Sequence, residues 1–185
     1  MPAFHPLTPG RWSDFEKLFG PRGACGGCWC MYWRQSRSQY EQQDGENNRL
    51  NMKALVDSGV VPGLLVYDGG EPVGWCSIAP REEFPTLGRS RVLKPVDAQP
   101  VWSLVCFFVA RGQRRKGRSV QLLQSAVVYA GSMGASIVEG YPVEPKNDKA
   151  PDVFIYTGLF SAFKQVGFTE VLRHSPTRPI MRYYL

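Results

Sequence analysis

Five basic side chains fall within eight residues, and glycines are interleaved with them. They are Arg111, Arg114, Arg115, Lys116 and Arg118, with Gly112 and Gly117 between them. A predicted helix begins directly after this segment, and the free N–H groups of a helix N-terminus attract anions. Glycine lets the backbone bend and approach a ligand closely. The segment is therefore suited to a pyrophosphate group.

One pattern that this segment partly matches is the nucleotide-binding loop GxxxxGK[ST]. Gly112, Gly117 and Ser119 fit the pattern, but Arg118 stands where that loop has its lysine. The lysine normally reaches the β- and γ-phosphates of the nucleotide. No apolar strand ending in aspartate follows, and the best candidate, 64–68, lies upstream. A nucleoside triphosphatase is therefore a poor match.

The elements that must position the basic segment are a strand before it and a helix after it. Residues 101–109 are apolar at nearly every position, which predicts a strand buried on both faces. Residues 119–130 carry apolar side chains on one face, which predicts an amphipathic helix. A polar segment at 80–100 is expected to be a long loop.

The rest of the chain predicts further helices and strands in an alternating order. Helices are expected over 8–19, 47–58 and around 159–166; strands over 63–67, 72–78, 136–143, 169–173 and 180–185, with Asp68-Gly69-Gly70 as a hairpin turn. This order predicts an α/β fold with one mixed central sheet flanked by helices.

A second pattern, [QR]xxGx[GA] after a strand, fits the basic segment better. Arg114 and Gly117 match it, Ser119 takes the last small position, and Val109 is the apolar residue five positions before the arginine. In this respect the segment resembles the acyl-coenzyme A motif of the GNAT acetyltransferase superfamily. Residues 60–173 also resemble that superfamily in their element order.

This resemblance implies a fold and a cosubstrate. The fold is a single acyl-coenzyme A N-acyltransferase-like domain over residues 1–185, with six to seven strands and a splayed central strand pair. The cosubstrate is acetyl-coenzyme A, and the acceptor is an amine of a small molecule or a peptide. The resemblance implies direct transfer of the acetyl group, without a covalent enzyme intermediate.

The resemblance also implies where coenzyme A would bind. Its pyrophosphate is expected on the loop residues Arg114, Arg115, Lys116, Gly117, Arg118 and Ser119. The pantetheine arm is expected along the strand edge at Phe107, Phe108 and Val109. A backbone N–H near Phe108 or Val109 would polarise the thioester carbonyl.

The general acid is where the chain departs from the family. The usual tyrosine position is occupied by Phe163, which cannot donate a proton. Tyr156 and Tyr141 are the candidate replacements, although a thiolate of pKa about 8.5 can also leave unprotonated. Glu139 is the first candidate for the base that takes a proton from the amine, and Glu82 and Glu83 come second.

The cysteine-rich segment Cys25-Gly-Gly-Cys28-Trp29-Cys30 permits two interpretations. It offers three thiolates where zinc prefers four ligands, and no second CxxC is present. Buried cysteine also packs as a small apolar residue. We expect a packed wall and no metal.

Composition narrows the function classes. Hydrophobic residues make up 43% and charged residues 21% of the chain, which excludes a disordered or fibrous protein. Five cysteines in an odd set predict a reducing, cytoplasmic location, and no apolar run is long enough to predict a membrane span. The sequence leaves a homodimer open.

Two other functions remain as alternatives. The net charge of +6 is compatible with a basic nucleic-acid-binding module that uses residues 111–118. Clustering at one helix start, rather than along a stripe, makes this less favoured. The phenylalanine at position 163 leaves a non-catalytic acyl-coenzyme A sensor as the other alternative.

Overall fold

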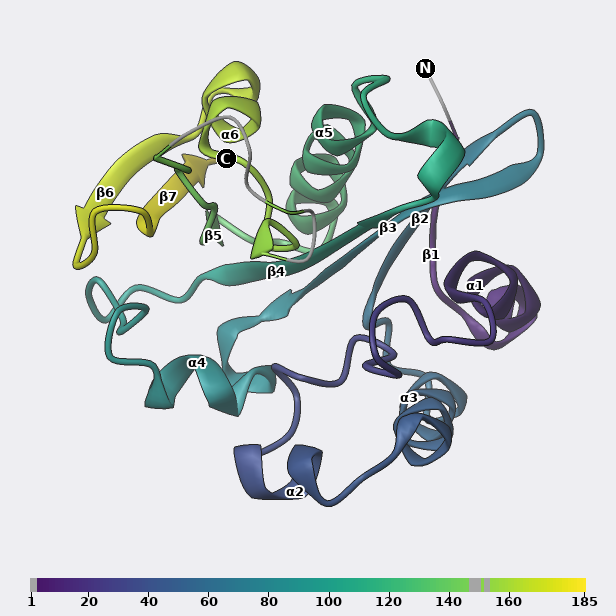
Figure 1. Cartoon of the computed structure of the whole chain (residues 1–185). Coiled ribbons are helices and arrows are strands. Elements are labelled where there is room, and N and C mark those ends of the chain that lie inside the picture. Colours follow the sequence, from purple (N-terminus) through teal and green to yellow (C-terminus); the bar gives the residue numbers. More distant parts are fainter. Residues whose placement is uncertain (1–2, 147–150, 152–153) are drawn as a thin grey trace.

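The computed structural model describes residues 3–146, 151 and 154–185. Seven strands form one open sheet in the order β1-β2-β3-β4-β5-β7-β6 (Figure 1). Among the pairs of these strands in the described residues, only β4 with β5 is parallel. The strands are β1 (Phe4–Pro6), β2 (Gly63–Asp68), β3 (Glu71–Pro80), β4 (Trp102–Val109), β5 (Ile137–Gly140), β6 (Thr169–Arg173) and β7 (Pro179–Tyr184). The predicted α/β fold with a mixed sheet is confirmed.

Helices cover both faces of this sheet (Figure 1). On one face lie α5 (Arg118–Ser132) and α6 (Phe160–Val166). The other face carries α1 (Trp12–Phe19), α2 (Arg37–Glu41), α3 (Gly45–Asp57) and α4 (Pro85–Arg89). Short 3-10 turns precede α1, α4 and α5 at Pro9–Arg11, Arg81–Glu83 and Arg111–Gln113. The apolar stripe of α5 supplies Leu122, Leu123 and Ala126 to the core beneath it.

Three short elements escaped the sequence-based prediction. The segment 80–100 contains α4, which begins with Pro85 in its first turn and buries Leu87 completely. β1 adds a three-residue edge strand to β2. α2 starts at a capping box formed by Ser36 and Gln39. Elements this short leave too little periodic pattern to be recognised from sequence.

The central strands part after a short paired stretch. The pairing of β4 with β5 joins Trp102, Ser103 and Leu104 to Val138, Glu139 and Gly140 and ends there. Beyond that stretch, residues 106–109 of β4 pair with β3 and with no other described strand, and Val105 is skipped by a shift in register. β4 and β5 therefore diverge, and the end of β4 that leads into the basic loop has one edge turned toward a gap.

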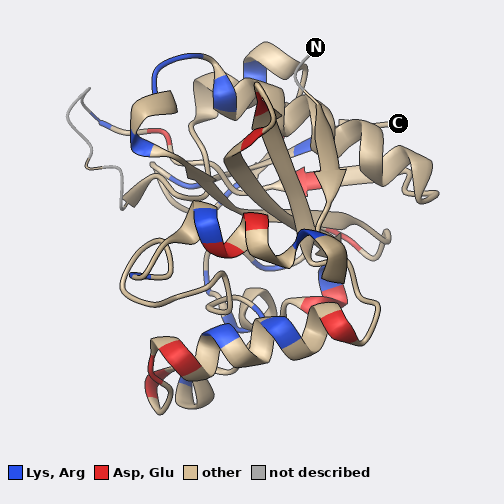
Figure 2. Ribbon diagram, turned by 90° about the vertical axis from the view of Figure 1, so that its right-hand side faces the viewer, with Lys and Arg blue, Asp and Glu red and all other residues tan. Residues whose placement is uncertain are grey.

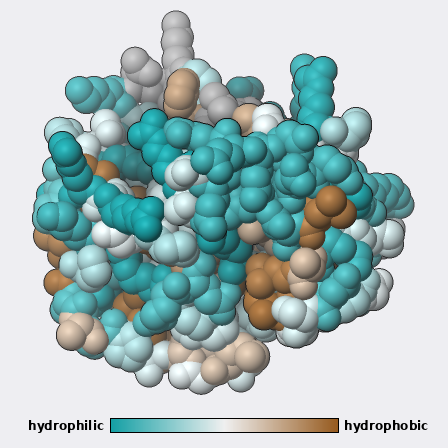
Figure 3. All heavy atoms as spheres, turned by 90° about the horizontal axis from the view of Figure 1, so that it is seen from below, coloured by the Kyte–Doolittle hydropathy of each residue, from teal (hydrophilic) through white to brown (hydrophobic). Residues whose placement is uncertain are grey.

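The surface on the α2 and α3 side is typical of a domain whose hydrophobic cores are buried. Seen from below, the face that carries α2 and α3 is mostly hydrophilic, with a hydrophobic area to the right of the centre and smaller ones toward the left edge (Figure 3). Leu50 of α3 is half exposed. No helix among the described residues is long and apolar enough to span a membrane.

Candidate functional site

The basic loop meets α5 at a glycine with left-handed backbone. Gly117 caps the helix with φ +72°, and no side chain supplies a capping hydrogen bond. The first N–H of α5 that returns to the loop belongs to Gln121, which donates to the Gly117 carbonyl at 3.1 Å. The N–H groups of residues 118–120 precede it and are the ones that a helix start offers to an anion.

The space above this loop is open. A Cβ atom added at Gly112 or Gly117 would meet nothing of the described chain within 4 Å. Arg115 has φ +59°, so two of the three residues 115–117 are left-handed, which points successive N–H groups in similar directions. A loop at the top of the ribbon in Figure 2 is coloured for Lys and Arg positions, and Arg115 and Lys116 of the basic loop are exposed. The loop therefore has room and charge for a phosphate group.

Some of the predicted cationic side chains bond to other groups of the protein. Arg118 has a side chain only 12% exposed, and it pairs with Asp68 at the end of β2 and contacts Gln113. Arg114 donates through Nε to the Val109 carbonyl at 3.2 Å. Arg115 and Lys116 are exposed. Sequence reasoning could not separate these roles, because Asp68 lies fifty positions from Arg118.

The edge of β4 presents alternate amides to the gap between β4 and β5. The Phe107 N–H donates to the Tyr156 carbonyl at 2.6 Å, and the Ala110 N–H donates to Val73 on the opposite side at 3.0 Å. Because amides alternate along a strand, the Phe108 N–H faces β3 and the Val109 N–H faces the gap. Val109 is therefore the residue of the predicted pair whose amide can reach a ligand in the gap.

Tyr156 lies beside this edge. Its ring packs on a cluster that includes Cys106 and Val105 of β4. Burial, with the nearby Cys106 thiol, raises the pKa of its phenol above the ordinary value. The phenol therefore keeps its proton at neutral pH.

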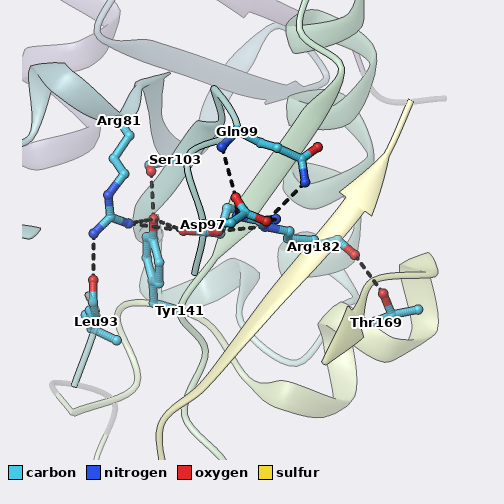
Figure 4. Close-up of polar contacts among 9 residues, drawn as sticks. Arg81, Leu93, Asp97, Gln99, Ser103, Tyr141, Thr169 and Arg182 are labelled. Carbon is cyan, nitrogen blue, oxygen red and sulfur yellow. Dashed lines mark hydrogen bonds and ion pairs between the residues drawn. The ribbon is translucent and has the colours of Figure 1, made fainter. Parts of the chain in front are cut away.

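Glu139 and Tyr141 lie in a closed polar network, and Tyr141 packs in the same cluster as Leu87 of α4. Figure 4 shows Tyr141 in this network with Arg81 and Ser103. Glu139 is 1% exposed, and its two carboxylate oxygens accept from Arg81 Nη1 at 3.0 Å and Arg182 Nε at 2.8 Å. The Tyr141 hydroxyl donates to Glu139 at 2.8 Å and lies 2.7 Å from Ser103 Oγ. Burial raises the pKa of Tyr141, and the adjacent Glu139 carboxylate adds to this effect.

Asp97 extends the network to the long segment before β4. Its two oxygens accept from Arg182 at 2.7 and 3.0 Å, which fastens residues 90–100 to β7 (Figure 4). Arg81 also donates to the Leu93 carbonyl at 2.6 Å. The network thus ties β5 and β7 to the loop that follows α4.

A family model described as the acetyltransferase (GNAT) family matches residues 27–155. The chain belongs to the GNAT acetyltransferase family. It is accordingly an acyltransferase, and the resemblance predicted from the loop motif is confirmed. A search of curated proteins gives no significant match.

Solved acetyltransferase structures share this fold at low sequence identity. A GNAT acetyltransferase from Listeria monocytogenes aligns with 100% of this chain and 95% of its own at a TM-score of 0.60 and 11% identity. The PaiA N-acetyltransferase of Thermoplasma acidophilum, solved with coenzyme A, aligns over 100% of this chain and 99% of its own, with a TM-score of 0.55 and 14% identity. The YncA acetyltransferase of Salmonella typhimurium, solved with acetyl-coenzyme A, aligns over 100% of this chain and 94% of its own, with a TM-score of 0.54 and 12% identity.

Phe163, where the resemblance to the family predicts a tyrosine, is part of the core of this acetyltransferase. Phe163 is fully buried, and its ring lies so close to two glycines that a Cβ atom at Gly140 or Gly158 would come within 2.1 or 2.7 Å of it. Phe107 of β4 meets the same ring edge-on at 6.1 Å. Phe163 therefore seals the α6 face of the gap.

The second-choice bases lie on the opposite side of the sheet, as do Cys30 and Cys106, whereas Cys76 lies in the core under α5. Glu83 pairs with Arg34 at 2.7 Å, and Glu82 lies beside it in the 3-10 turn before α4. All five cysteines are unpaired. Among the described residues of this acetyltransferase, no group of three or more ligands is placed to hold a metal ion. The absence of a metal remains a prediction.

Proposed function

We propose that this acetyltransferase moves the acetyl group of acetyl-coenzyme A directly to an amine of a small molecule or a peptide. The observation that carries the proposal is the adjacency of two features: the uncapped start of α5, and the β4 edge that faces the gap. The helix start suits a pyrophosphate and the strand edge suits a pantetheine arm, and only the four residues 110–113 separate β4 from Arg114.

The loop residues have separate duties in this proposal. The N–H groups of Arg118 and Ser119 bind pyrophosphate oxygens, while Arg115 and Lys116 supply charge from exposed positions. Gly117 adopts the left-handed backbone from which the helix starts, a conformation that glycine takes without steric cost. Arg114 and Arg118 fix the shape of the loop through Val109 and Asp68.

The β4 edge would hold the reacting thioester. Val109 has its N–H on the gap side, so this group can donate to the thioester carbonyl and stabilise the negative charge that develops there. The Phe107 N–H already donates to the Tyr156 carbonyl, so a pantetheine arm could bond to this N–H only if that hydrogen bond were broken. Phe108 contributes packing against Phe19 at 5.3 Å.

Tyr156 is the acid that we propose. As the amine nitrogen bonds to the acetyl carbon, the carbon–sulfur bond breaks, and the departing thiolate takes the phenolic proton. Tyr141 and Glu139 are less suited to proton exchange with a substrate, because both are buried and bonded to each other and to Arg81. A base role for Glu139 would require one arginine to move away.

Two broader proposals accompany this assignment. The described residues are all connected through one sheet, which supports a single domain over residues 1–185. The unpaired state of the cysteines supports the reducing, cytoplasmic setting that the sequence predicts.

The test is thermal stabilisation by acetyl-coenzyme A in the wild type and in a matched pair of variants. A ligand at one hundred times its Kd adds about 2.7 kcal/mol, which raises Tm by about 5–10 °C for a chain of this size. Gly117→Glu places a negative charge at the start of α5, and we expect it to abolish the shift. Gly117→Ala strains the left-handed backbone at a cost of about 1 kcal/mol but keeps the charge, and we expect the shift to remain.

Two ligands distinguish the alternatives in the same experiment. Stabilisation by ATP with magnesium, or by a short DNA duplex, in place of acetyl-coenzyme A would overturn the proposal. Acetylated product from a panel of amines separates an enzyme from a non-catalytic sensor. Mass analysis of the protein during turnover tests direct transfer, since an acetylated cysteine would contradict it.

A further inference from the structure

The segment Cys25–Cys30 has no part in the proposed transfer, yet its last cysteine lies in an unusual polar setting. Cys30 is 4% exposed and sits in the core cluster formed by α1, α3 and β3. Trp29 and Cys30 have φ of +41° and +61°, two consecutive left-handed residues that are not glycine. Such backbone is disfavoured and persists only where the surrounding structure holds it in place.

Hydrogen-bond donors from two neighbouring strands converge on the Cys30 sulfur. The Trp75 indole Nε1 donates to Sγ at 3.2 Å. Ser77 lies two residues along β3, on the same face as Trp75, and Cys106 is its register partner on β4. The Cys106 thiol packs against the cluster that contains Cys30 and lies within hydrogen-bonding reach of its sulfur, whereas the Ser77 hydroxyl donates to the Pro62 carbonyl at 3.1 Å. Two donors directed at one sulfur stabilise the negative charge of a thiolate.

The pKa values of the Cys30 and Cys106 thiols are shifted in opposite directions. Burial by itself would raise the pKa of Cys30, but the hydrogen bonds from Cys106 and Trp75 and the Arg34 charge outweigh it and lower that pKa. The pKa of Cys106 is raised, first by its hydrogen bond to Cys30 and then by burial. Cys30 is therefore the attacking sulfur of the pair and Cys106 the resolving one.

The other cysteines lack this arrangement. Cys76 is fully buried on the opposite face of β3, next to the Leu122 carbonyl, and burial raises the pKa of its thiol. Cys28 donates to the Gly23 carbonyl at 3.7 Å, and burial raises its pKa too. Cys25 is exposed and faces Cys28 across a two-glycine turn closed by a 3.2 Å backbone hydrogen bond. Cys25 and Cys28 therefore form the rival pair.

We infer that Cys30 and Cys106 form a peroxide-sensitive dithiol that oxidises to a disulfide between the segment before α2 and strand β4. The Cys30 thiolate attacks one peroxide oxygen, the O–O bond breaks, and Cys30 becomes a sulfenic acid as hydroxide leaves. The Cys106 sulfur then attacks the Cys30 sulfur, the S–O bond breaks, and water leaves with the proton of the Cys106 thiol. Two thiols lose two electrons to one hydroperoxide.

The position of Cys106 gives this modification a consequence for the gap. Cys106 directly precedes Phe107, whose amide is bonded to Tyr156, and it packs against Tyr156 in the same cluster. A Cys30–Cys106 bond would fasten residues 28–41 to the strand that borders the gap. Reduction would release it, as is usual for the transient disulfides of proteins in a reducing compartment.

The test is disulfide mapping of the full-length chain after treatment with hydrogen peroxide. Thiol titration of the unfolded chain should fall from five to three, and dithiothreitol should restore it. Trypsin releases residues 23–34 with Cys25, Cys28 and Cys30, and residues 92–111 with Cys106. We expect these two peptides to be joined, and fragmentation of the joined species to place the bond at Cys30. The readout does not require acetyltransferase activity, so it is independent of the proposed function.

Variants and a rival pairing make the outcome decisive. Cys30→Ser and Cys106→Ser should each prevent the cross-link, whereas Cys76→Ser should leave it intact and lower the count from four to two. If a serine variant does not fold, the wild-type peptide map decides alone. A Cys25–Cys28 bond in its place, or five thiols retained under oxidation, would overturn the inference.

Discussion

The backbone N–H of Phe107 donates a 2.6 Å hydrogen bond to the carbonyl of Tyr156 across the gap where β4 leaves β5. This bond places a tyrosine beside the strand edge proposed for the thioester, whereas Phe163, where the resemblance to the family predicts a tyrosine, is buried. Because the backbone makes the contact, the side chain can be changed while the position of residue 156 is preserved.

Tyr156→Phe should lower kcat by about 10²-fold, because a positioned acid contributes about that much or more. KM for acetyl-coenzyme A should stay within about twofold, since the backbone bond to Phe107 remains. The pKa of Tyr156 is raised, so the phenol stays protonated above the ordinary tyrosine pKa of about 10. Loss of this proton should therefore not reduce the wild-type kcat at any pH up to about 10. Steady-state kinetics from neutral to alkaline pH make this measurement.

Tyr141→Phe is the matched control for that substitution. It removes a buried hydroxyl bonded to Arg81, Ser103 and Glu139, so it should cost about 1–3 kcal/mol of stability with little change in kcat. Equal rates in wild type and Tyr156→Phe, with a slow Tyr141→Phe, would reverse the two assignments.

Glu139→Gln should destabilise the fold strongly. It leaves Arg81 and Arg182 buried beside a neutral amide, and loss of one partner from a buried ion pair costs about 3–5 kcal/mol. Chemical denaturation of wild type and variant gives this difference directly. Glu41→Gln removes an exposed pair with Arg37 and should change stability by less than about 0.5 kcal/mol. A stable Glu139→Gln that has lost activity would favour the base role.

Asp97 should make stability sensitive to acid. Its two hydrogen bonds from Arg182 hold the pKa of the carboxyl well below its ordinary value. A carboxyl with a lowered folded-state pKa stabilises the fold above its unfolded pKa of about 3.9, and that stability is lost as the pH falls further. The Tm difference between wild type and Asp97→Asn should therefore be largest near neutral pH and shrink below about pH 4. A difference that is constant with pH would contradict this.

Phe163→Tyr should not restore a family-like acid. The ring is fully buried against Gly140 and Gly158, so an added hydroxyl overpacks the site at about 1–3 kcal/mol and remains away from solvent. Thermal unfolding and kcat together give the result. Phe160→Tyr, on the partly exposed side of the same helix, is the control and should leave stability nearly unchanged. A gain in kcat with Phe163→Tyr would show that residue 163 reaches the leaving group.

Local pattern was enough to predict the α/β class, the loop before α5 and most of the strands. Residues 102–109 are apolar nearly throughout, and Gly69 and Gly70 take the positive φ values that a tight hairpin needs. Such features depend on neighbours in the chain and are therefore visible in the sequence. The short elements β1 and α4 were missed, because their formation depends on packing against β2 and on the burial of Leu87.

The sequence by itself determined the chemistry that the loop can offer: glycines, cations and a helix start at fixed spacing. Tertiary structure decided which side chains remain available for it. Glu139 meets Arg81 and Arg182 from 58 and 43 positions away, and Arg118 meets Asp68 from 50. The partner of a polar side chain depends on where distant strands bring other charges, and no local spacing encodes that.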